Sequence, residues 1–254
     1  MNSATAERLL AINREFYNRF GDSFSATRQR LQPGVKKILN EIQDDDSVLD
    51  LGCGNGIFLH EISRRGHKQP LLGVDFNLPL LRNAESAPEV IFRKVDLTQL
   101  SANSEQLLTA PAAGDGGGDS ALSEKSGGWS VITMFAALHH IPSNEIRLDI
   151  LRTVQKLLKP NGKFILSNWQ FLNSEKLKAR IQPWDMVGLS SSDVDEGDYL
   201  LDWRSGGQGL RYAHHFSVEE LLGLAEQAGM SVSDSFLSDG ENGRLGLYQV
   251  WSGG

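Results

Sequence analysis

VLDLGCGNG, from Val48 to Gly56, is the segment of the chain with the clearest structural signal. Its apolar first half is typical of a buried strand that carries Asp50, and glycines follow at alternate positions from Gly52 through Gly54 to Gly56. This pattern predicts an open backbone turn at the carboxyl end of a parallel strand. Open α/β sheets bind nucleotide-like ligands at that edge. The segment therefore predicts a site for such a ligand.

The spacing of the glycines narrows the choice of ligand. A dinucleotide fingerprint reads G-x-G-x-x-G, and the third glycine here comes one residue early, so that Ile57 stands in its place. Asp50 would repel a pyrophosphate, because like charges repel strongly in a poorly screened cleft. S-adenosylmethionine has an ammonium, a sulfonium and no phosphate, and it therefore suits a loop that contains a carboxylate. A glycine-rich turn without a ligand is the alternative interpretation.

Strand and helix patterns alternate along the chain. Periodicity predicts helices over residues 4–20, 35–42, 55–66 and 143–158, and strands over 48–51, 71–75, 90–95, 129–134 and 163–169. Near the end, Ser217 and Glu220 form a capping box for a helix that ends at Gly229, and residues 231–237 and 246–251 form a hairpin. We expect an α/β fold with a doubly wound, mostly parallel sheet and a C-terminal antiparallel hairpin, in a single domain over residues 1–254.

The composition limits the remaining possibilities. The chain has 254 residues, enough for one domain with a good core, and no apolar run is long enough to cross a bilayer. The N-terminus has no apolar signal core, so we expect a cytoplasmic protein rather than a secreted one. The net charge of −7 provides no general attraction for nucleic acid, and an RNA contact would need a local basic patch. Cys53 is the single cysteine, and it suits a small lining residue of the turn better than a catalytic thiol.

Residues 101–128 interrupt the alternation. The stretches AAGDGGGDS and SEKSGG are rich in glycine, serine and alanine and contain little that could be buried. We therefore expect a flexible surface insertion between the third and fourth predicted strands.

Polar residues stand at the ends of three further strands. Asp75 can accept hydrogen bonds from both hydroxyls of a ribose, and Asp96 can accept one from an adenine amino group; a turn or capping role is the alternative for each. His139 and His140 are candidates for a base or a substrate-positioning group, because imidazole titrates near neutral pH. A lone histidine is more often structural, which is the alternative for both. The histidine pairs of the chain are adjacent rather than four residues apart on a helix, so we expect no metal.

Together, the glycine loop, the two strand-end acids, the segment FAALHHI and the terminal hairpin resemble the class I S-adenosylmethionine-dependent methyltransferases, over residues 35–251 apart from the insertion. The resemblance implies a Rossmann-like sheet of seven strands whose last hairpin supplies the antiparallel strand. It also implies that the loop passes under the methionine part of S-adenosylmethionine, with Asp50 near the ammonium, Asp75 on the ribose and Asp96 with Leu97 around the adenine. The implied cofactor-binding residues are Asp50, Gly52, Cys53, Gly54, Asn55, Gly56, Asp75, Phe76, Asp96, Leu97, Phe135 and Tyr17.

The two flanks of the chain resemble a narrower family. FYNRFGDSFSATRQR, residues 16–30, and the stretches GDYLLDWRSGG and LRYAHHFSVEEL within residues 197–221 are similar to segments of the eukaryotic tRNA wobble-uridine carboxymethyl methyltransferases. Those enzymes esterify the carboxylate of a carboxymethyluridine in the anticodon loop. The chain departs from them in its insertion and in residues 168–185.

A carboxylate acceptor calls for particular side chains. It is already a nucleophile at neutral pH and needs alignment rather than a strong base, and arginine binds carboxylates with two donors. Arg28 and Arg211 are therefore our candidates for the acceptor site, with Arg30 and Arg204 beside them, and residues 1–34 form a helical lid or substrate segment. The aromatic candidates for stacking on a splayed base are Tyr17, Trp169, Trp203 and Tyr212. Alternatively, these arginines are solvated and these aromatic rings fill the core.

Three functions follow from this sequence. The first is methylation of a modified uridine in tRNA, and the second is O- or N-methylation of a small metabolite with help from His139 or His140. The third is a cofactor-binding partner subunit without turnover, which the intact glycine loop and Asp50 disfavour. The narrower resemblance also allows an activating protein partner, and nothing in the sequence indicates a membrane.

Overall fold

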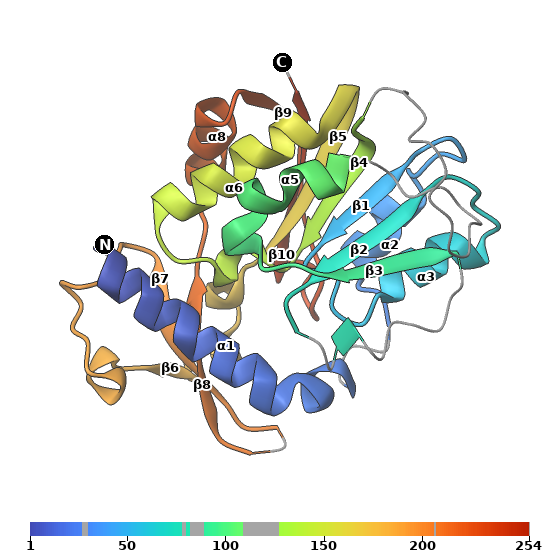
Figure 1. Ribbon diagram of the computed structural model, residues 1–254. Helices are drawn as coiled ribbons and strands as arrows, with labels where there is room; N and C mark the ends of the chain where they lie inside the picture. Colours follow the sequence, from blue (N-terminus) through green and yellow to red (C-terminus); the bar gives the residue numbers. More distant parts are fainter. Residues whose placement is uncertain (27–29, 78–79, 82–88, 109–126, 206, 254) are drawn as a thin grey trace.

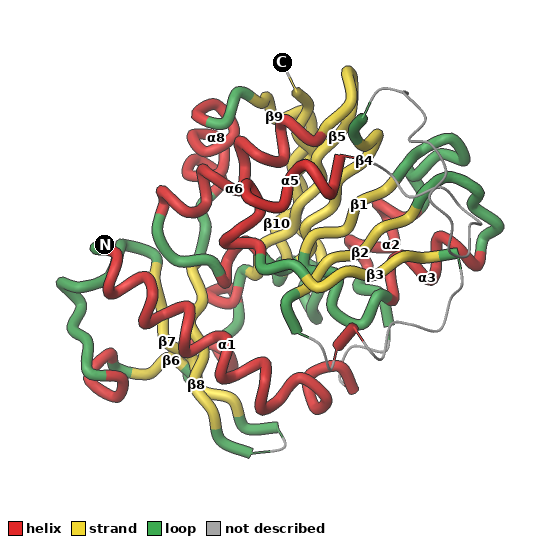
Figure 2. The backbone as a smooth tube through the Cα atoms, in the orientation of Figure 1, coloured by secondary structure: helices red, strands yellow, loops and turns green. Residues whose placement is uncertain are grey.

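The computed structural model describes residues 1–26, 30–77, 80–81, 89–108, 127–205 and 207–253. Its main sheet has seven strands in the order β3-β2-β1-β4-β5-β10-β9 (Figures 1 and 2). The strands are β1 (Val48–Leu51), β2 (Leu71–Asp75), β3 (Val90–Lys94), β4 (Trp129–Phe135), β5 (Leu158–Trp169), β9 (Met230–Ser238) and β10 (Gly246–Gly253). From β3 to β5 the neighbours run parallel, whereas β10 is antiparallel to both β5 and β9. The predicted seven-stranded sheet with its antiparallel hairpin is confirmed.

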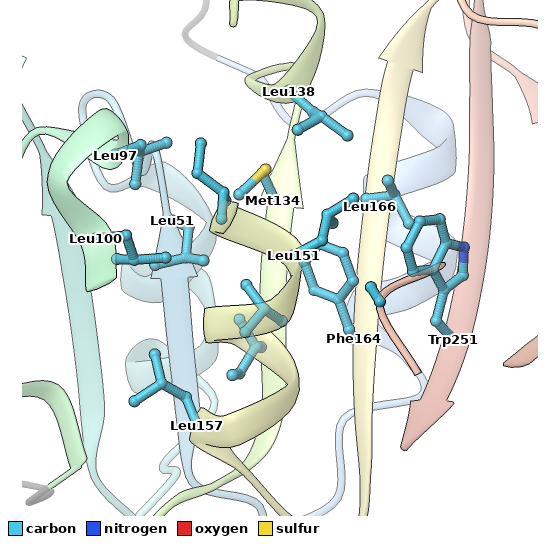
Figure 3. Packing of buried hydrophobic residues seen from close by; sticks show 14 of the residues in the cluster. Leu51, Leu97, Leu100, Met134, Leu138, Leu151, Leu157, Phe164, Leu166 and Trp251 are labelled. Carbon is cyan, nitrogen blue, oxygen red and sulfur yellow. The ribbon is translucent and has the colours of Figure 1, made fainter. Parts of the chain in front are cut away.

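Helices cover both faces of this sheet, which is why its central strands are buried on both sides. One face carries α2 (Pro33–Leu39) and α3 (Ile57–Arg64), and the other carries α5 (Leu100–Leu108), α6 (Asn144–Leu157) and α8 (Val218–Gln227). Figure 3 shows part of the second layer, where Leu151 of α6 lies near Phe164 of β5, Trp251 of β10 lies beyond Phe164, and Leu157 of α6 lies apart from them on the side of Leu51. The strand order reverses between β1 and β4, so the carboxyl ends of these two strands flank the point where open α/β sheets bind ligands.

The helix α5 corrects the boundary of the predicted insertion. Residues 101–108 are helical, and Leu100 and Leu107, seven positions apart, are both buried against the sheet. The indole nitrogen of Trp129 donates a hydrogen bond to the Leu107 carbonyl oxygen at 2.7 Å, which ties α5 to β4. The flexible insertion is therefore wrong for its first eight residues. Residues 109–126 lie outside the described part of the chain.

A second, smaller sheet lies beside the carboxyl edge of the main one (Figure 1). It consists of the antiparallel strands β6 (Ile181–Gln182), β7 (Asp198–Trp203) and β8 (Gly209–His214). The first helix, α1 (Ser3–Ala26), is longer than predicted and packs on it, with Leu9 against Tyr212 and Phe16 against Trp203. The sequence did not predict this sheet. Short helical turns lead into it, at Phe171–Asn173 (η3), Glu175–Lys178 (α7) and Trp184–Val187 (η4).

Within the described ranges, no helix combines the length and the apolar character needed to cross a bilayer.

Candidate functional site

A cavity of about 230 Å³ opens at the carboxyl edge of β1 to β4, underneath α1. Every residue that the resemblance implied for the cofactor lines this cavity, apart from Gly56. These residues are Tyr17, Asp50, Gly52, Cys53, Gly54, Asn55, Asp75, Phe76, Asp96, Leu97 and Phe135. Helix α1 contributes one face, from Leu10 through Asn13 and Arg14 to Tyr17, and its Ser25 contributes further along.

The glycines of the loop occupy backbone conformations that other residues rarely adopt. Their φ angles are +74° at Gly52, +57° at Gly54 and +68° at Gly56. A side chain at Gly52 would also clash, because its Cβ would lie 2.8 Å from the Cβ of Ala137. Gly56 stands at the start of α3 instead of facing the cavity, so its role is to turn the chain into the helix.

Asp50 is an almost fully buried carboxyl group at the bottom of the cavity. Its side chain accepts a hydrogen bond from the Thr133 hydroxyl at 2.7 Å. Burial raises the pKa of Asp50 to about 7; the Thr133 hydrogen bond opposes this rise and the charge of Asp75 adds to it. A cation beside Asp50 would favour its ionised form.

Asp75 ends β2 and fastens the glycine loop. Its carboxylate accepts backbone hydrogen bonds from Gly54 and Asn77, each at 2.9 Å. Burial raises its pKa, while these backbone donors oppose the rise. Because each carboxylate oxygen can accept more than one hydrogen bond, the group can also receive hydroxyls from a ligand.

Asp96 follows β3 and joins two parts of the chain. One carboxylate oxygen accepts bonds from the Thr98 amide at 3.0 Å and hydroxyl at 2.8 Å, and the other pairs with Arg14 of α1 at 2.6 Å. Burial favours its neutral form, but the hydrogen bonds from Thr98 and Arg14 outweigh it and lower the pKa. Arg14 was not among the predicted residues, because nothing local in the sequence connects positions 14 and 96.

The two predicted histidines are neighbours, but their surroundings in the structure differ. His140 lines the cavity, whereas His139 is 2% exposed, stands outside the described lining and accepts a long hydrogen bond from the Trp169 amide at 3.4 Å. The Nδ1 atom of His140 lies 3.0 Å from the Tyr212 carbonyl oxygen. Because a carbonyl only accepts, Nδ1 carries the hydrogen, and Nε2 of the neutral ring is the nitrogen that can take a proton.

The predicted arginines have different surroundings. Arg28 lies outside the described residues, and Arg30 lines the cavity. Arg211 is 5% exposed and stands outside the described lining, with its guanidinium 4.6 Å from the ring centre of Trp169 and 5.5 Å from those of Phe16 and Trp203. Arg204 is exposed and pairs with Asp202 at 2.6 Å. The prediction that Tyr212 stacks on a base is wrong, because its side chain is fully buried.

The chain was compared with known proteins. Residues 24–234 match the family profile described as "Methyltransferase domain". The chain belongs to this methyltransferase family. A candidate methyltransferase of Encephalitozoon cuniculi is 28% identical over 221 residues, which cover 86% of this chain and 87% of that protein.

Two other relatives of the methyltransferase have names that point to different processes. The tRNA (carboxymethyluridine(34)-5-O)-methyltransferase ALKBH8 of Mus musculus is 25% identical over 74% of this chain but only 25% of its own length. The ubiquinone biosynthesis O-methyltransferase of Chromobacterium violaceum is 24% identical over 73% of this chain and 64% of its own.

Solved structures share the fold. A SAM-dependent methyltransferase from Methanosarcina mazei superposes with a TM-score of 0.61 and 22% identity over 88% of this chain and 98% of that chain. An amino pentose methyltransferase of Micromonospora echinaspora, solved with S-adenosylmethionine bound, has a TM-score of 0.57 and 16% identity over 91% and 95% of the two chains.

The cofactor of this methyltransferase is S-adenosylmethionine, and the cavity fits it. Buried Asp50 suits the ammonium, Asp75 has acceptors for the ribose hydroxyls, and Leu97 offers an apolar wall beside Asp96. A phosphate would face three carboxylates, which is unfavourable. When bound, the cofactor supplies an electrophilic methyl group on its sulfonium. In the described ranges no three His, Cys, Asp or Glu side chains gather as a metal would require, and the absence of a metal stays a prediction.

Buried polar contacts hold α1 and the small sheet against this site. Asn13 of α1 donates to the carbonyl oxygens of His140 and Tyr212, at 3.0 and 3.1 Å, and accepts from the Tyr212 amide at 2.8 Å. Arg147 of α6, 1% exposed, donates to the Tyr212 hydroxyl at 2.9 Å, and this hydroxyl donates to Asp198 at 2.6 Å. Sequence reasoning missed both residues, because their partners are far away along the chain.

Proposed function

We propose that this methyltransferase esterifies the carboxylate of a carboxymethyl group on a uridine of tRNA. The observation that carries the proposal is the surroundings of Arg211. Its guanidinium is buried among the rings of Phe16, Trp169 and Trp203. A permanently charged group in such a place suits an anionic acceptor, because arginine binds carboxylates in a two-pronged geometry.

Neighbouring residues connect Arg211 to the cavity. Tyr212 follows it directly and contacts His140 through its carbonyl oxygen, and Phe16 precedes Tyr17, which lines the cavity. A carboxylate is ionised at neutral pH, so these residues would hold and align it without removing a proton. The ring of Trp169 is only partly buried and suits stacking with a base taken out of an RNA loop, whereas Trp203 is packed against Phe16 in a buried cluster. The name of the mouse relative supports the same substrate class.

The product can be identified by its chemistry. The enzyme is incubated with cofactor labelled in the methyl group and either total tRNA or an anticodon stem-loop that carries carboxymethyluridine, with the unmodified uridine stem-loop as control. We expect label in the first two RNAs only, and we expect mild alkali to release it, because a methyl ester is hydrolysed whereas a methyl ether or amine is stable. Label that never enters RNA would overturn the proposal.

Variants of Arg211 test its role. Arg211→Met keeps much of the side-chain volume but removes the charge, and it should lower kcat/KM for the modified stem-loop by about 10- to 100-fold while leaving cofactor affinity unchanged. Arg152→Met, which makes the same change at an exposed position of α6, is the control. Equal activity of both variants would remove Arg211 from the acceptor site.

A second candidate function is O-methylation of a small molecule, and the geometry of His140 favours it. With Nδ1 committed to the Tyr212 carbonyl, Nε2 is suited to take a proton from a hydroxyl acceptor. The name of the bacterial relative, an O-methyltransferase of ubiquinone biosynthesis, supports O-methylation. Alkali-stable label in a metabolite extract, lost in His140→Gln, would support it. A cytoplasmic location and an activating protein partner stay predictions.

A further inference from the structure

The ion pair between Arg14 and Asp96 lies at the end of the cavity that suits the adenine. Arg14 stands on α1 and lines the cavity, and its Nη2 atom lies 2.6 Å from Oδ2 of Asp96. The other carboxylate oxygen accepts both bonds from Thr98, so the Asp96 side chain has a fixed orientation and presents Oδ2 to the helix. Leu97, the wall suited to the adenine, follows immediately and lines the same end of the cavity.

Polar contacts at Asn13, Arg14 and Ser25 help to attach α1 around the cavity, and these three contacts differ in strength. At Asn13 the helix is held by two buried hydrogen bonds to the Tyr212 backbone and a part-buried one to the His140 carbonyl oxygen. At Ser25 its hydroxyl receives a side-chain bond from Asn55 of the glycine loop at 3.2 Å. Between them, the Arg14–Asp96 pair is part-exposed, with side-chain exposures of 47% and 28%. An ion pair of that exposure is weak and can break and re-form repeatedly.

Exchange of the cofactor makes this difference important. Helix α1 lines the cavity, and every turnover requires a used cofactor to leave this cavity and a new one to enter it. The buried bonds of Asn13 keep the helix attached to β8, whereas the more exposed Arg14–Asp96 contact can open while those bonds stay in place. A planar guanidinium held at the adenine end can also cover the face of a purine ring.

We propose that Arg14 is a cofactor-binding residue and that its pair with Asp96 forms a latch which retains the adenosyl group under α1 and opens during exchange. The latch acts on the cofactor only, so it is independent of the acceptor. Failure of the tRNA proposal would leave it standing, because its test contains no acceptor.

The test measures release of S-adenosylhomocysteine from the full-length protein in a stopped-flow experiment. Arg14→Ala should raise the dissociation rate about three- to tenfold and change the association rate much less. Arg14→Lys, which keeps the charge but loses the planar fork, should lie in between. Arg8→Ala removes an exposed arginine from the same helix and should behave as wild type. The same loss of affinity should appear with 5′-methylthioadenosine, which keeps the adenosyl part of the ligand.

A double-mutant comparison separates the latch from a general effect on the helix. Asp96→Asn alone should also speed release, and its combination with Arg14→Ala should add little to either single change. Raising the salt concentration should speed release from wild type and leave Arg14→Ala unaffected. Amide hydrogen exchange of α1 identifies any variant whose helix is unfolded, in which case Arg14→Lys decides. Unchanged release in Arg14→Ala and Arg14→Lys, or full additivity of the Arg14 and Asp96 changes, would overturn the proposal.

Discussion

The buried carboxyl group of Asp50 makes the stability of the ligand-free enzyme depend on pH. In the folded protein its pKa is raised from 3.8 to about 7, mainly by burial. Between these two pH values the folded protein keeps the Asp50 proton, whereas the unfolded chain has released it. The stability that the protonated Asp50 allows is therefore complete below pH 3.8 and is lost as the pH rises through about 7. At about 1.4 kcal/mol per pH unit, the loss is on the order of 4 kcal/mol.

Asp50→Asn removes this dependence with little change of shape, because the amide oxygen can still accept the Thr133 hydroxyl. The free energy of unfolding of wild type and variant is measured in urea at a series of pH values without cofactor. We expect the free energy of unfolding of the variant to rise relative to that of wild type as the pH rises, by about 4 kcal/mol in total. Asp45→Asn, at an exposed position of the turn before β1, should show no such trend.

Cofactor binding provides the complementary measurement. An ammonium beside Asp50 favours its ionised form, so binding below pH 7 should release nearly one proton from wild type and none from Asp50→Asn. Calorimetry in two buffers with different ionisation enthalpies measures this release. If wild type and variant differ by a constant amount across the pH series and bind without proton release, Asp50 is ionised throughout and the reasoning is refuted.

Two further changes test how the backbone and the buried network support the site. Gly66 has a φ of +87° and open space where a Cβ would lie, so Gly66→Ala should cost about 1–2 kcal/mol of stability from backbone strain alone. Gly52→Ala should cost more, because a Cβ at Gly52 would also lie 2.8 Å from the Cβ of Ala137. Urea denaturation measures the difference, and equal losses would contradict the clash. Arg147→Met should destabilise the protein by about 3–5 kcal/mol, because it removes the guanidinium 3.7 Å from the buried Asp198 and leaves that carboxylate only its hydrogen bonds with neighbours such as Tyr212 and His214; a loss below about 1 kcal/mol would show that the pair contributes little.

The cofactor half of the site could be predicted from the sequence because its signals are local. The glycine loop, Asp75 and Asp96 each stand at the carboxyl end of a strand, and a parallel sheet brings such ends to one edge. Only the side-chain partners escaped prediction. The Arg14–Asp96 and Asn13–Tyr212 contacts join positions 82 and 199 residues apart, and no local pattern encodes them.

The small sheet escaped prediction for a different reason. Strand β7 reads DYLLDW, and its burial does not alternate, because α1 covers one face and the segment around Phe171 covers the other. A strand buried on both faces lacks the period of two that identifies half-buried strands. The helix α5 was missed because the glycine-rich residues after it dominate the composition, and apart from Ala102 its apolar residues are Leu100, Leu107 and Leu108 alone.

The long-range contacts of Asn13 also affect how the chain folds as it is synthesised. Asn13 of α1 leaves the ribosome long before its partner Tyr212, which follows 199 residues later. At about 5–20 residues per second, the apolar face of α1 waits on the order of 10–40 seconds for the strand that covers it. During that interval Leu9, Phe16 and Phe20 are exposed to solvent or bound by a chaperone. The glycine loop is synthesised long before β8 is available to hold α1 over the cavity, so the nascent chain has the loop well before it has an enclosed site.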